Sequence, residues 1–289
     1  MQDRKTIFVT GATGRQGSAA ALHLARKGFR VKALARNTDS PSLESLKKLN
    51  IEIVKGDLND ANTFTDHLKG AYGVFCALTF KNGTDTETRQ GITLADLSKQ
   101  QGVSHFIYSS VIAADLHTGV AHWESKFKIE THIKEIGLPY TILRPSSFYE
   151  NFLIPAIKKR IEKGVFPSPL DKHTVQQFIS TDDIGRITAA ILSRPPDYLN
   201  KEFAVAAEQM DMGEVAALFS KCLDKRVKYQ QLPAWLVRLA IGKNVYRMLK
   251  WVNNHDSIFV KDIEAFKKEF PGMINLEEWI KTHFNKTPG

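Results

Sequence analysis

The sequence has few cysteines and no long hydrophobic run. Its 289 residues include only two cysteines, Cys76 and Cys222, and their wide separation is unlike the disulfide framework of a small secreted domain. No apolar stretch approaches the roughly 18 residues that a membrane-spanning helix needs. The first residues also lack the apolar core of a signal peptide. We therefore expect a cytoplasmic protein that has no membrane partner.

Motifs of metal sites, hydrolases and nucleic-acid readers are also missing. The nine histidines show no H-E-x-x-H or other metal-ligand spacing, and the sequence contains no G-x-S-x-G turn. The net charge is +9, from 40 Lys and Arg against 31 Asp and Glu, but no zinc-finger spacing or basic zipper accompanies it. We predict no metal and no direct nucleic-acid binding. The positive charge fits an anionic small ligand or an acidic partner.

What the sequence does contain is a regular alternation of short apolar runs and helical patterns. This alternation predicts right-handed βαβ units and a doubly wound parallel sheet, which is the α/β class with a Rossmann fold. Strands are expected at 7–10, 30–35, 51–55, 73–78, 105–109 and 140–143, and helices at 16–27, 42–49, 61–68, 87–101 and 122–136.

The alternation ends after residue 145. A short strand at 178–179 and a helix at 182–192, which begins at an acidic cap, are expected to return to the sheet. The remainder of the chain is predicted to be mostly helical. We therefore predict a dinucleotide-binding Rossmann domain over 1–150, to which 176–197 return, and a smaller substrate or effector lobe from 151–175 and 198–289.

Three glycines follow the first predicted strand with the spacing G-x-x-G-x-x-G. Gly11 permits a tight turn, Gly14 lets a phosphate approach the backbone, and Gly17 lets helix and strand pack closely. The helix that begins here offers free N–H groups and a positive dipole end to a pyrophosphate. No Gly-Lys-Ser/Thr ends the loop, so it is not a Walker loop. The context of strand, glycines and helix predicts dinucleotide binding instead of a bare turn.

The end of the second predicted strand indicates which dinucleotide binds. A site for NAD usually has Asp or Glu there, whereas this chain has Arg36. A guanidinium can form charge-assisted hydrogen bonds with a 2′-phosphate and stack on the adenine ring. We therefore predict NADP(H) over NAD(H). Asp57, after the third strand, is placed to meet the adenine amino group or to cap a helix.

Several short motifs together resemble one known family. They are "TGATGRQG", "ARN", "KGDLND", "GAYGVF", "RQG", "HFIYSS", "AHWESK" and "FYENFL", and the likeness continues to "LEEWIKTHF" near the end. Their order and spacing resemble the NmrA-like family, an atypical branch of the short-chain dehydrogenase/reductases, and within it the NADP(H)-sensor proteins. This resemblance implies a Rossmann domain and a small C-terminal lobe with a cleft between them.

The resemblance also implies a set of coenzyme-binding residues. They come from the glycine loop, the arginine after the second strand, the turns after the third and fourth strands, two basic helix residues and a segment facing the nicotinamide. In this sequence they are Gly11, Ala12, Thr13, Gly14, Arg15, Gln16, Gly17, Arg36, Asp57, Leu58, Thr79, Phe80, Arg89, Lys126, Phe148, Tyr149, Glu150 and Asn151.

The catalytic groups of the wider superfamily are only partly present. Short-chain dehydrogenases typically use a serine and a Tyr-x-x-x-Lys pair, and here Ser109 ends the fifth strand while His122 precedes Lys126 by four residues. His122 and Lys126 would share one helix face, and the histidine could serve as an acid or base. Lys126 could also act alone, as in isoflavone-reductase-like relatives, or only hold the ribose. Tyr149 could replace the missing phenol or be a packing aromatic.

Residues 232–252 mix tryptophans and aliphatic residues with four cations. Such a stretch could lie on a membrane, dock a partner, or form two helices that cover a cleft with their apolar side inward. We favour the covering helices, with Gly242 between them and an apolar pocket beneath.

Two functions are consistent with these residues. The first is an NADP(H)-binding redox sensor that responds to the NADPH/NADP+ ratio and changes its contacts with a regulatory protein partner. The second is an NADPH-dependent reductase of quinones or of other small carbonyl or enone substrates. The missing tyrosine favours the sensor, in which no hydride transfer is needed. Either protein could be a monomer or a homodimer.

Overall fold

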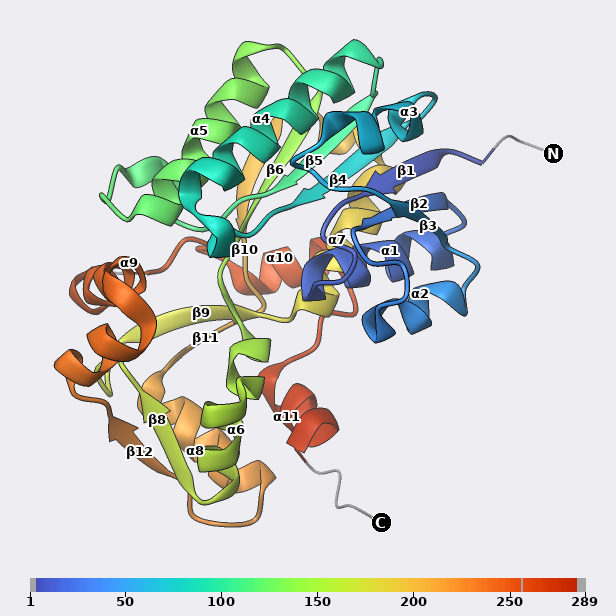
Figure 1. The fold of residues 1–289 in the computed structure, drawn as a ribbon. Helices are drawn as coiled ribbons and strands as arrows, with labels where there is room; N and C mark the ends of the chain where they lie inside the picture. Colours follow the sequence, from blue (N-terminus) through green and yellow to red (C-terminus); the bar gives the residue numbers. More distant parts are fainter. Residues whose placement is uncertain (1–3, 256, 285–289) are drawn as a thin grey trace. The chain divides into compact units, whose positions relative to one another are not determined.

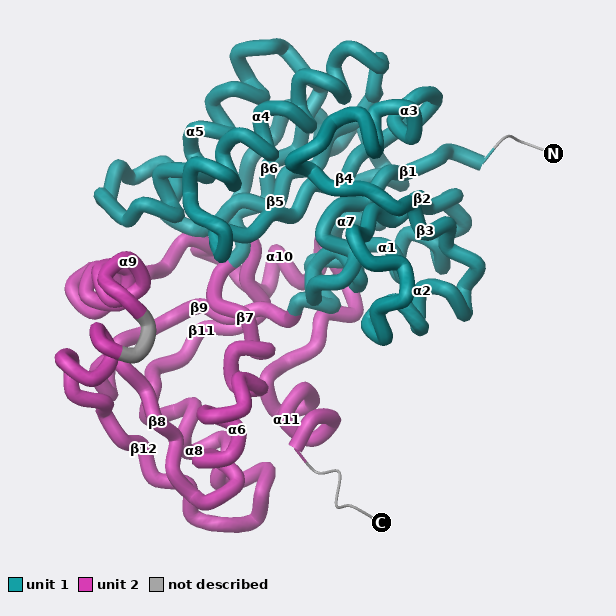
Figure 2. Tube along the Cα trace, viewed as in Figure 1, with its two compact units in different colours: residues 1–145, 181–204 teal, residues 146–180, 205–289 magenta. Residues whose placement is uncertain are grey.

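The computed structural model describes residues 4–255 and 257–284, and the chain forms two compact units (Figure 2). Unit 1 consists of residues 1–145 and 181–204, and unit 2 consists of residues 146–180 and 205–289. The chain therefore leaves unit 1, returns to it for one segment, and leaves it again.

The centre of unit 1 is a seven-stranded sheet in the order β10-β6-β5-β4-β1-β2-β3 (Figure 1). Neighbouring strands from β6 to β3 pair in parallel. The strand order reverses between β1 and β4, and open α/β sheets bind ligands outside the carboxyl ends at such a point. The strands are β1 (Thr6–Val9), β2 (Arg30–Ala35), β3 (Glu52–Lys55), β4 (Gly73–Ala77), β5 (His105–Ser109), β6 (Tyr140–Pro145) and β10 (Lys201–Val205).

Helices cover both faces of this sheet (Figure 1). On one face α4 packs against α5, and on the other α1 packs against α7. A Cβ added at Gly185 in α7 would lie 2.5 Å from the backbone of Ala19 in α1, so the close approach of these helices requires a glycine. The helices are α1 (Arg15–Arg26), α2 (Glu44–Lys47), α3 (Thr65–Leu68), α4 (Thr84–Gln100), α5 (Ala121–Glu135) and α7 (Thr181–Ser193).

A hydrophobic core lies between the sheet and the layer of α3, α4 and α5. Phe8, Val74 and Phe106 contribute from three neighbouring strands, and Leu94 and Ile129 contribute from α4 and α5. This burial on both faces explains why the strands appear in the sequence as continuous apolar runs.

The predicted Rossmann sheet is confirmed. The strands expected at 30–35 and 105–109 have those bounds. The helices expected at 42–49 and 61–68 are shorter, because each is a 3-10 turn followed by a single α-helical turn.

Unit 2 combines helices with two small sheets. Its helices are α6 (Pro155–Glu162), α8 (Met212–Cys222), α9 (Ala234–Asn254), α10 (Ile263–Glu269) and α11 (Leu276–Phe284). One sheet has the order β11-β9-β7 and the other pairs β12 with β8. Their strands are β7 (Ser147–Phe148), β8 (Val165–Ser168), β9 (Val175–Ile179), β11 (Glu208–Asp211) and β12 (Lys228–Gln231). Five strands were not predicted, namely β7, β8, β11 and β12 of unit 2 and β10 of unit 1, because they are short and show no clear alternation of apolar and polar side chains. The strand expected at 178–179 is part of β9 and belongs to a sheet of unit 2, so it does not return to the main sheet.

The core of unit 2 is aromatic. The ring of Phe152 lies between 5.3 and 6.3 Å, centroid to centroid, from those of Phe166, Phe178, Phe219 and Trp279. These five rings come from segments that are far apart in the sequence, so their packing joins the small sheets to α8 and α11.

The residues of α9 form two helical pieces that meet at a kink. Gly242 has a φ of 80° inside it, which confirms the predicted break between two helical pieces. Within the described residues, no helix is long and apolar enough to cross a membrane.

Candidate functional site

The glycine loop forms a tight turn between β1 and α1. The Gly14 amide donates to the Gly11 carbonyl at 2.8 Å, and Gly11 has a φ of 66°, in the left-handed region. A Cβ at Gly17 would lie 2.3 Å from the Gly11 carbonyl carbon and oxygen. Gly17 therefore cannot carry a side chain in this turn, and α1 begins directly at the loop.

Two polar contacts hold the loop against the neighbouring strands. The Thr10 hydroxyl accepts from the Ala77 amide at 3.0 Å, which joins the ends of β1 and β4. The Ser109 hydroxyl donates to Oε1 of Gln16 at 2.6 Å. The serine that we considered as a catalytic group is therefore engaged with the glycine loop.

The predicted coenzyme-binding residues that follow β2, β3 and β4 lie at one edge of the sheet. Arg36 directly follows β2, Asp57 follows β3, and Thr79 and Phe80 follow β4. Because β3, β2, β1 and β4 are parallel neighbours, their carboxyl ends and the glycine loop meet at the same edge. Arg36 and Thr79 are exposed, while Asp57, Leu58 and Phe80 are half-buried. Residues distant in sequence are thus gathered around the switch point.

Asp57 has a structural role in this edge. Its Oδ1 accepts from the backbone amide of Asn59 at 3.0 Å and from the Asn59 side chain at 3.1 Å. The helix cap that we considered for Asp57 is provided by Asp60, which accepts from the Asn62 amide. Asp57 therefore shapes the turn after β3.

Lys126 forms a buried ion pair that the sequence analysis missed. Its Nζ donates to Oε1 of Glu87 at 2.8 Å, and the Ser125 hydroxyl donates to Oε2 of Glu87 at 2.7 Å. Glu87 is fully buried and Lys126 is nearly so. The two residues are 39 positions apart on α4 and α5, so no local spacing signals the pair. The Glu87 carboxylate balances the charge of the Lys126 ammonium group and fixes the position of that group.

The groups around Lys126 are poor acids at neutral pH. The Tyr108 ring lies 5.7 Å from Nζ, and burial, followed by the nearby Glu87 charge, holds the pKa of its phenol well above the usual range. Burial also raises the pKa of the Cys76 thiol to about 12. Both groups therefore keep their protons, and Cys76 is not a thiolate nucleophile.

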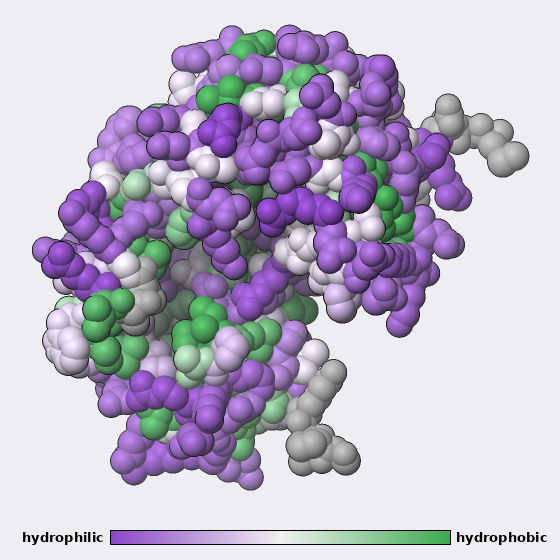
Figure 3. Space-filling model, viewed as in Figure 1, coloured by the Kyte–Doolittle hydropathy of each residue, from purple (hydrophilic) through white to green (hydrophobic). Residues whose placement is uncertain are grey.

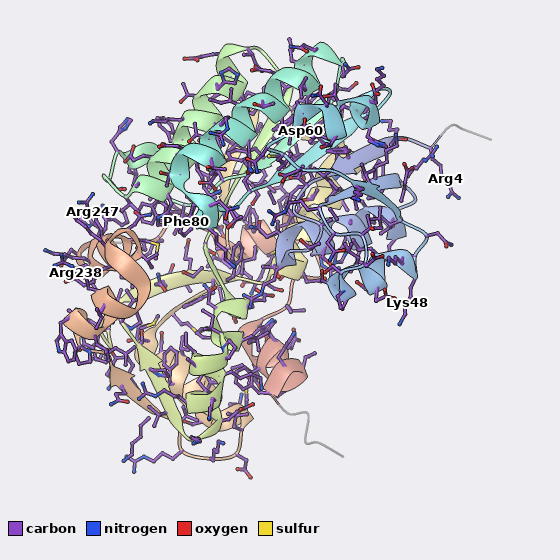
Figure 4. The ribbon with its side chains drawn as sticks, in the orientation of Figure 1. Arg4, Lys48, Asp60, Phe80, Arg238 and Arg247 are labelled. Atoms are coloured by element: carbon purple, nitrogen blue, oxygen red, sulfur yellow. The ribbon has the colours of Figure 1, made fainter. Side chains whose placement is uncertain are left out.

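His122 lies on α5, one turn before Lys126, as predicted. Its ring is buried and stacks on Phe80 with a centroid distance of 4.4 Å and an interplanar angle of 26°. Figure 4 labels Phe80 in the turn that precedes α4. Phe80 thus packs against the imidazole of His122.

The segment from Phe148 to Asn151 belongs to unit 2. Tyr149 is fully buried, and its hydroxyl donates to Oε2 of Glu208 at 2.8 Å. The same oxygen accepts from the Leu276 amide at 2.6 Å. The phenol is therefore part of the unit 2 core, which favours the packing role over that of the missing proton donor. Phe148 is half-buried, Glu150 is buried and Asn151 is exposed; Arg89, on α4 in unit 1, is also exposed.

In the part of the chain that the structure describes, no cluster of His, Cys, Asp or Glu could hold a metal ion. Cys76 is buried and Cys222 is half-buried, and no disulfide joins them.

The fold and the glycine turn define a class of protein. A parallel sheet in this order, with a glycine turn after its first strand and helices on both faces, is a Rossmann-type dinucleotide-binding fold. The model of the NmrA-like family matches residues 3–280. The chain therefore belongs to the NmrA-like family, as its motifs predicted.

Individual relatives agree with this assignment. The nitrogen metabolite repression protein nmrA of Emericella nidulans is 29% identical over 254 residues, covering 83% of this chain and 72% of that protein. The structure of NmrA, a negative transcriptional regulator in complex with NADP, has a TM-score of 0.81 at 23% identity, covering 98% of this chain and 96% of its own. An NADPH-dependent quinone oxidoreductase from Escherichia coli has a TM-score of 0.77 at 21% identity, covering 96% and 100%. At these identities the two structures show the fold alone.

Proposed function

We propose that this protein binds NADP(H) and acts as a redox sensor that responds to the NADPH/NADP+ ratio. The observation that carries the proposal is the position of Arg36. It is exposed at the end of β2, beside the glycine turn that ends β1. The turn and the first amides of α1 would hold the pyrophosphate, and the guanidinium would bind the 2′-phosphate. The complex of NmrA with NADP supports this proposal.

The remaining coenzyme contacts follow the sheet edge. Leu58 and Asp57 would border the adenine, and Thr79 and Phe80 would border the middle of the coenzyme. Lys126 would hold the ribose hydroxyls, with Arg89 completing the part of the site that unit 1 contributes. Several of these residues are exposed or half-buried at the carboxyl ends of the strands, where a ligand can reach them.

The proton chemistry favours a sensor over a dedicated reductase. The Lys126 ammonium group is already bonded to a buried carboxylate. The Tyr149 phenol is bonded to Glu208, and Ser109 is bonded to Gln16. Three groups that could have supplied or moved a proton are thus held in hydrogen bonds within the protein. We infer that these groups keep the site in shape and do not transfer protons.

A second candidate is an NADPH-dependent reductase of quinones or of other small carbonyl or enone compounds. The observation that favours it is the position of His122 and Lys126 one turn apart on α5, with the Phe80 ring stacked on the imidazole of His122. An exposed imidazole could donate a proton while the coenzyme supplies a hydride. The likeness of the fold of this chain to that of the quinone oxidoreductase agrees with this alternative.

The cellular compartment and the further ligand of the protein are also proposals. We propose a cytoplasmic protein, and the absence of a disulfide between Cys76 and Cys222 is consistent with a reducing compartment. We propose a monomer or homodimer whose further ligand is a small apolar substrate or a regulatory protein partner.

Two measurements separate the candidates. Calorimetric titration should give tighter binding of NADPH than of NADH, and different affinities for NADPH and NADP+. The absorbance of NADPH, followed with a panel of quinones and aldehydes, should stay near the uncatalysed rate. Turnover well above background that Lys126→Ala abolishes, with coenzyme binding retained, would establish the reductase. Equal or tighter binding of NADH would contradict the assignment of NADP(H).

A further inference from the structure

The first piece of α9 exposes large apolar side chains. Trp235 and Leu239 are 70% and 79% exposed and, being four residues apart, share one face of the helix. Val237, on the opposite face, is buried and anchors the helix in unit 2. Figure 3 shows green and pale residues on the surface at α9, on the left of the view. The cleft-covering interpretation of this segment is therefore wrong for these side chains, which point outward.

The second piece of α9 exposes positive charge. Lys243, Arg247 and Lys250 are all exposed, and their spacing of four and three residues places them on one face. Val252, on the opposite face, is buried. Arg238 adds a fourth cation, and the sequence of α9 contains no Asp or Glu. Figure 4 labels Arg238 and Arg247, and both extend outward from the helix.

We propose that α9 docks on the surface of an anionic phospholipid bilayer. Amphipathic helices that lie in the membrane interface combine exposed Trp and Leu with Lys and Arg. Trp235 and Leu239 would enter the headgroup region, where the amphipathic indole is favoured. Lys243, Arg247 and Lys250 would lie against the lipid phosphates.

The charges favour this occupant over two others. A second copy of the chain would bring four cations against four cations across a symmetric contact, which is repulsive. An acidic protein would satisfy the charges, but apolar side chains as exposed as Trp235 and Leu239 also need recessed pockets in such a partner. A fluid headgroup layer accepts them without a matching shape.

Co-sedimentation of the full chain with vesicles tests the proposal. The protein should bind vesicles of phosphatidylcholine mixed with phosphatidylserine, and should not bind vesicles of phosphatidylcholine alone. Added salt should weaken the binding. The tryptophan emission should shift to the blue on binding, because Trp235 is exposed, whereas Trp123 and Trp279 are buried and Trp251 is half-buried. The variant Trp235→Phe should lose this shift.

Two substitutions separate the apolar and the charged contributions. Leu239→Glu should abolish binding, and Lys243→Glu should weaken it about fivefold or more. The matched controls are Leu116→Glu, at a leucine that is 51% exposed in unit 1, and Lys48→Glu, whose lysine is labelled in Figure 4. Both controls should bind like the unaltered protein, and circular dichroism verifies that every variant is folded.

Several results would overturn the proposal. Failure to bind the phosphatidylserine vesicles, or equal binding to phosphatidylcholine alone, would do so. Controls that weaken binding as much as the α9 variants would show that the positive charge of the whole chain is responsible. A dimer that Leu239→Glu dissociates would assign the surface to a second copy. An acidic protein that binds through α9 in the absence of lipid binding would assign it to that partner.

Discussion

The two units differ in the side chains that stand out in each of them. Unit 1 buries charged and hydroxyl groups beside its candidate site, as in the contact between Lys126 and Glu87 and the contact between Ser109 and Gln16. Unit 2 has an aromatic core around Phe152, yet it exposes Trp235 and Leu239 on α9. Buried polar pairs fix groups at defined positions, whereas exposed apolar groups are available to a partner. This difference agrees with the proposals of a coenzyme site in unit 1 and of a docking surface on unit 2.

The largest expected effect tests the aromatic core of unit 2. Phe152→Ala should lower the free energy of unfolding by about 4 kcal/mol, because it removes a buried ring and leaves a cavity. Urea denaturation followed by circular dichroism measures the change. The exposed Leu116→Ala should change the free energy by less than about 0.5 kcal/mol. A similar small loss for Phe152→Ala would show that the aromatic cluster contributes little to stability.

The next effect concerns the buried ion pair of unit 1. Glu87→Gln should cost about 3 kcal/mol of unfolding free energy, since it leaves the Lys126 ammonium buried without a counter-charge. The double variant Glu87→Gln, Lys126→Met should regain much of this stability. It should still bind NADPH more weakly than the unaltered protein, because the lysine is gone.

Asp85→Asn is the matched control for the ion pair, because Asp85 is an exposed acid in the first turn of the same helix. Its unfolding free energy should stay within about 0.5 kcal/mol of the original. If Glu87→Gln is as mild as this control, the pair does not hold Lys126 in place.

A buried histidine should make the protein sensitive to acid. Burial lowers the pKa of His105 from 6.5 to about 4. Between these values the unfolded chain binds a proton that the folded chain does not, so stability falls as the pH falls through this window. Between about pH 7 and pH 5, the titration of His105 should lower the free energy of unfolding by about 2 kcal/mol.

Urea denaturation at both pH values measures this loss. His105→Gln, which removes the titrating group, should flatten the dependence on pH. The exposed His255→Gln should leave it unchanged. An unaltered slope in His105→Gln would assign the acid sensitivity to other groups.

The smallest expected effect concerns coenzyme choice. Arg36→Ala should weaken NADPH binding roughly tenfold, because it removes charge-assisted hydrogen bonds at an exposed position. Binding of NADH should change little, since NADH has no 2′-phosphate. Lys55→Ala, at an exposed cation that ends the next strand, is the control. Equal losses for both coenzymes would place Arg36 outside the 2′-phosphate site.

The sequence predicted the parts of the fold that depend on neighbouring residues. The alternation of strands and helices, the glycine turn at Gly11 and the break at Gly242 follow from periodicity and from backbone conformations that glycine allows. The position of Arg36 also follows, because a residue after a parallel strand must lie at the carboxyl edge of the sheet.

Contacts between distant residues could be decided only by the tertiary structure. Glu87 was only the first residue of a predicted helix until folding brought it to Lys126, and Glu208 gave no signal before it met Tyr149. The outward face of α9 was predicted wrongly, because an amphipathic pattern usually places its apolar face inward, whereas Trp235 and Leu239 are exposed. Neighbouring residues thus determined the sheet and the carboxyl edge at which the coenzyme is proposed to bind. Packing decided which polar groups are paired and which apolar ones remain exposed.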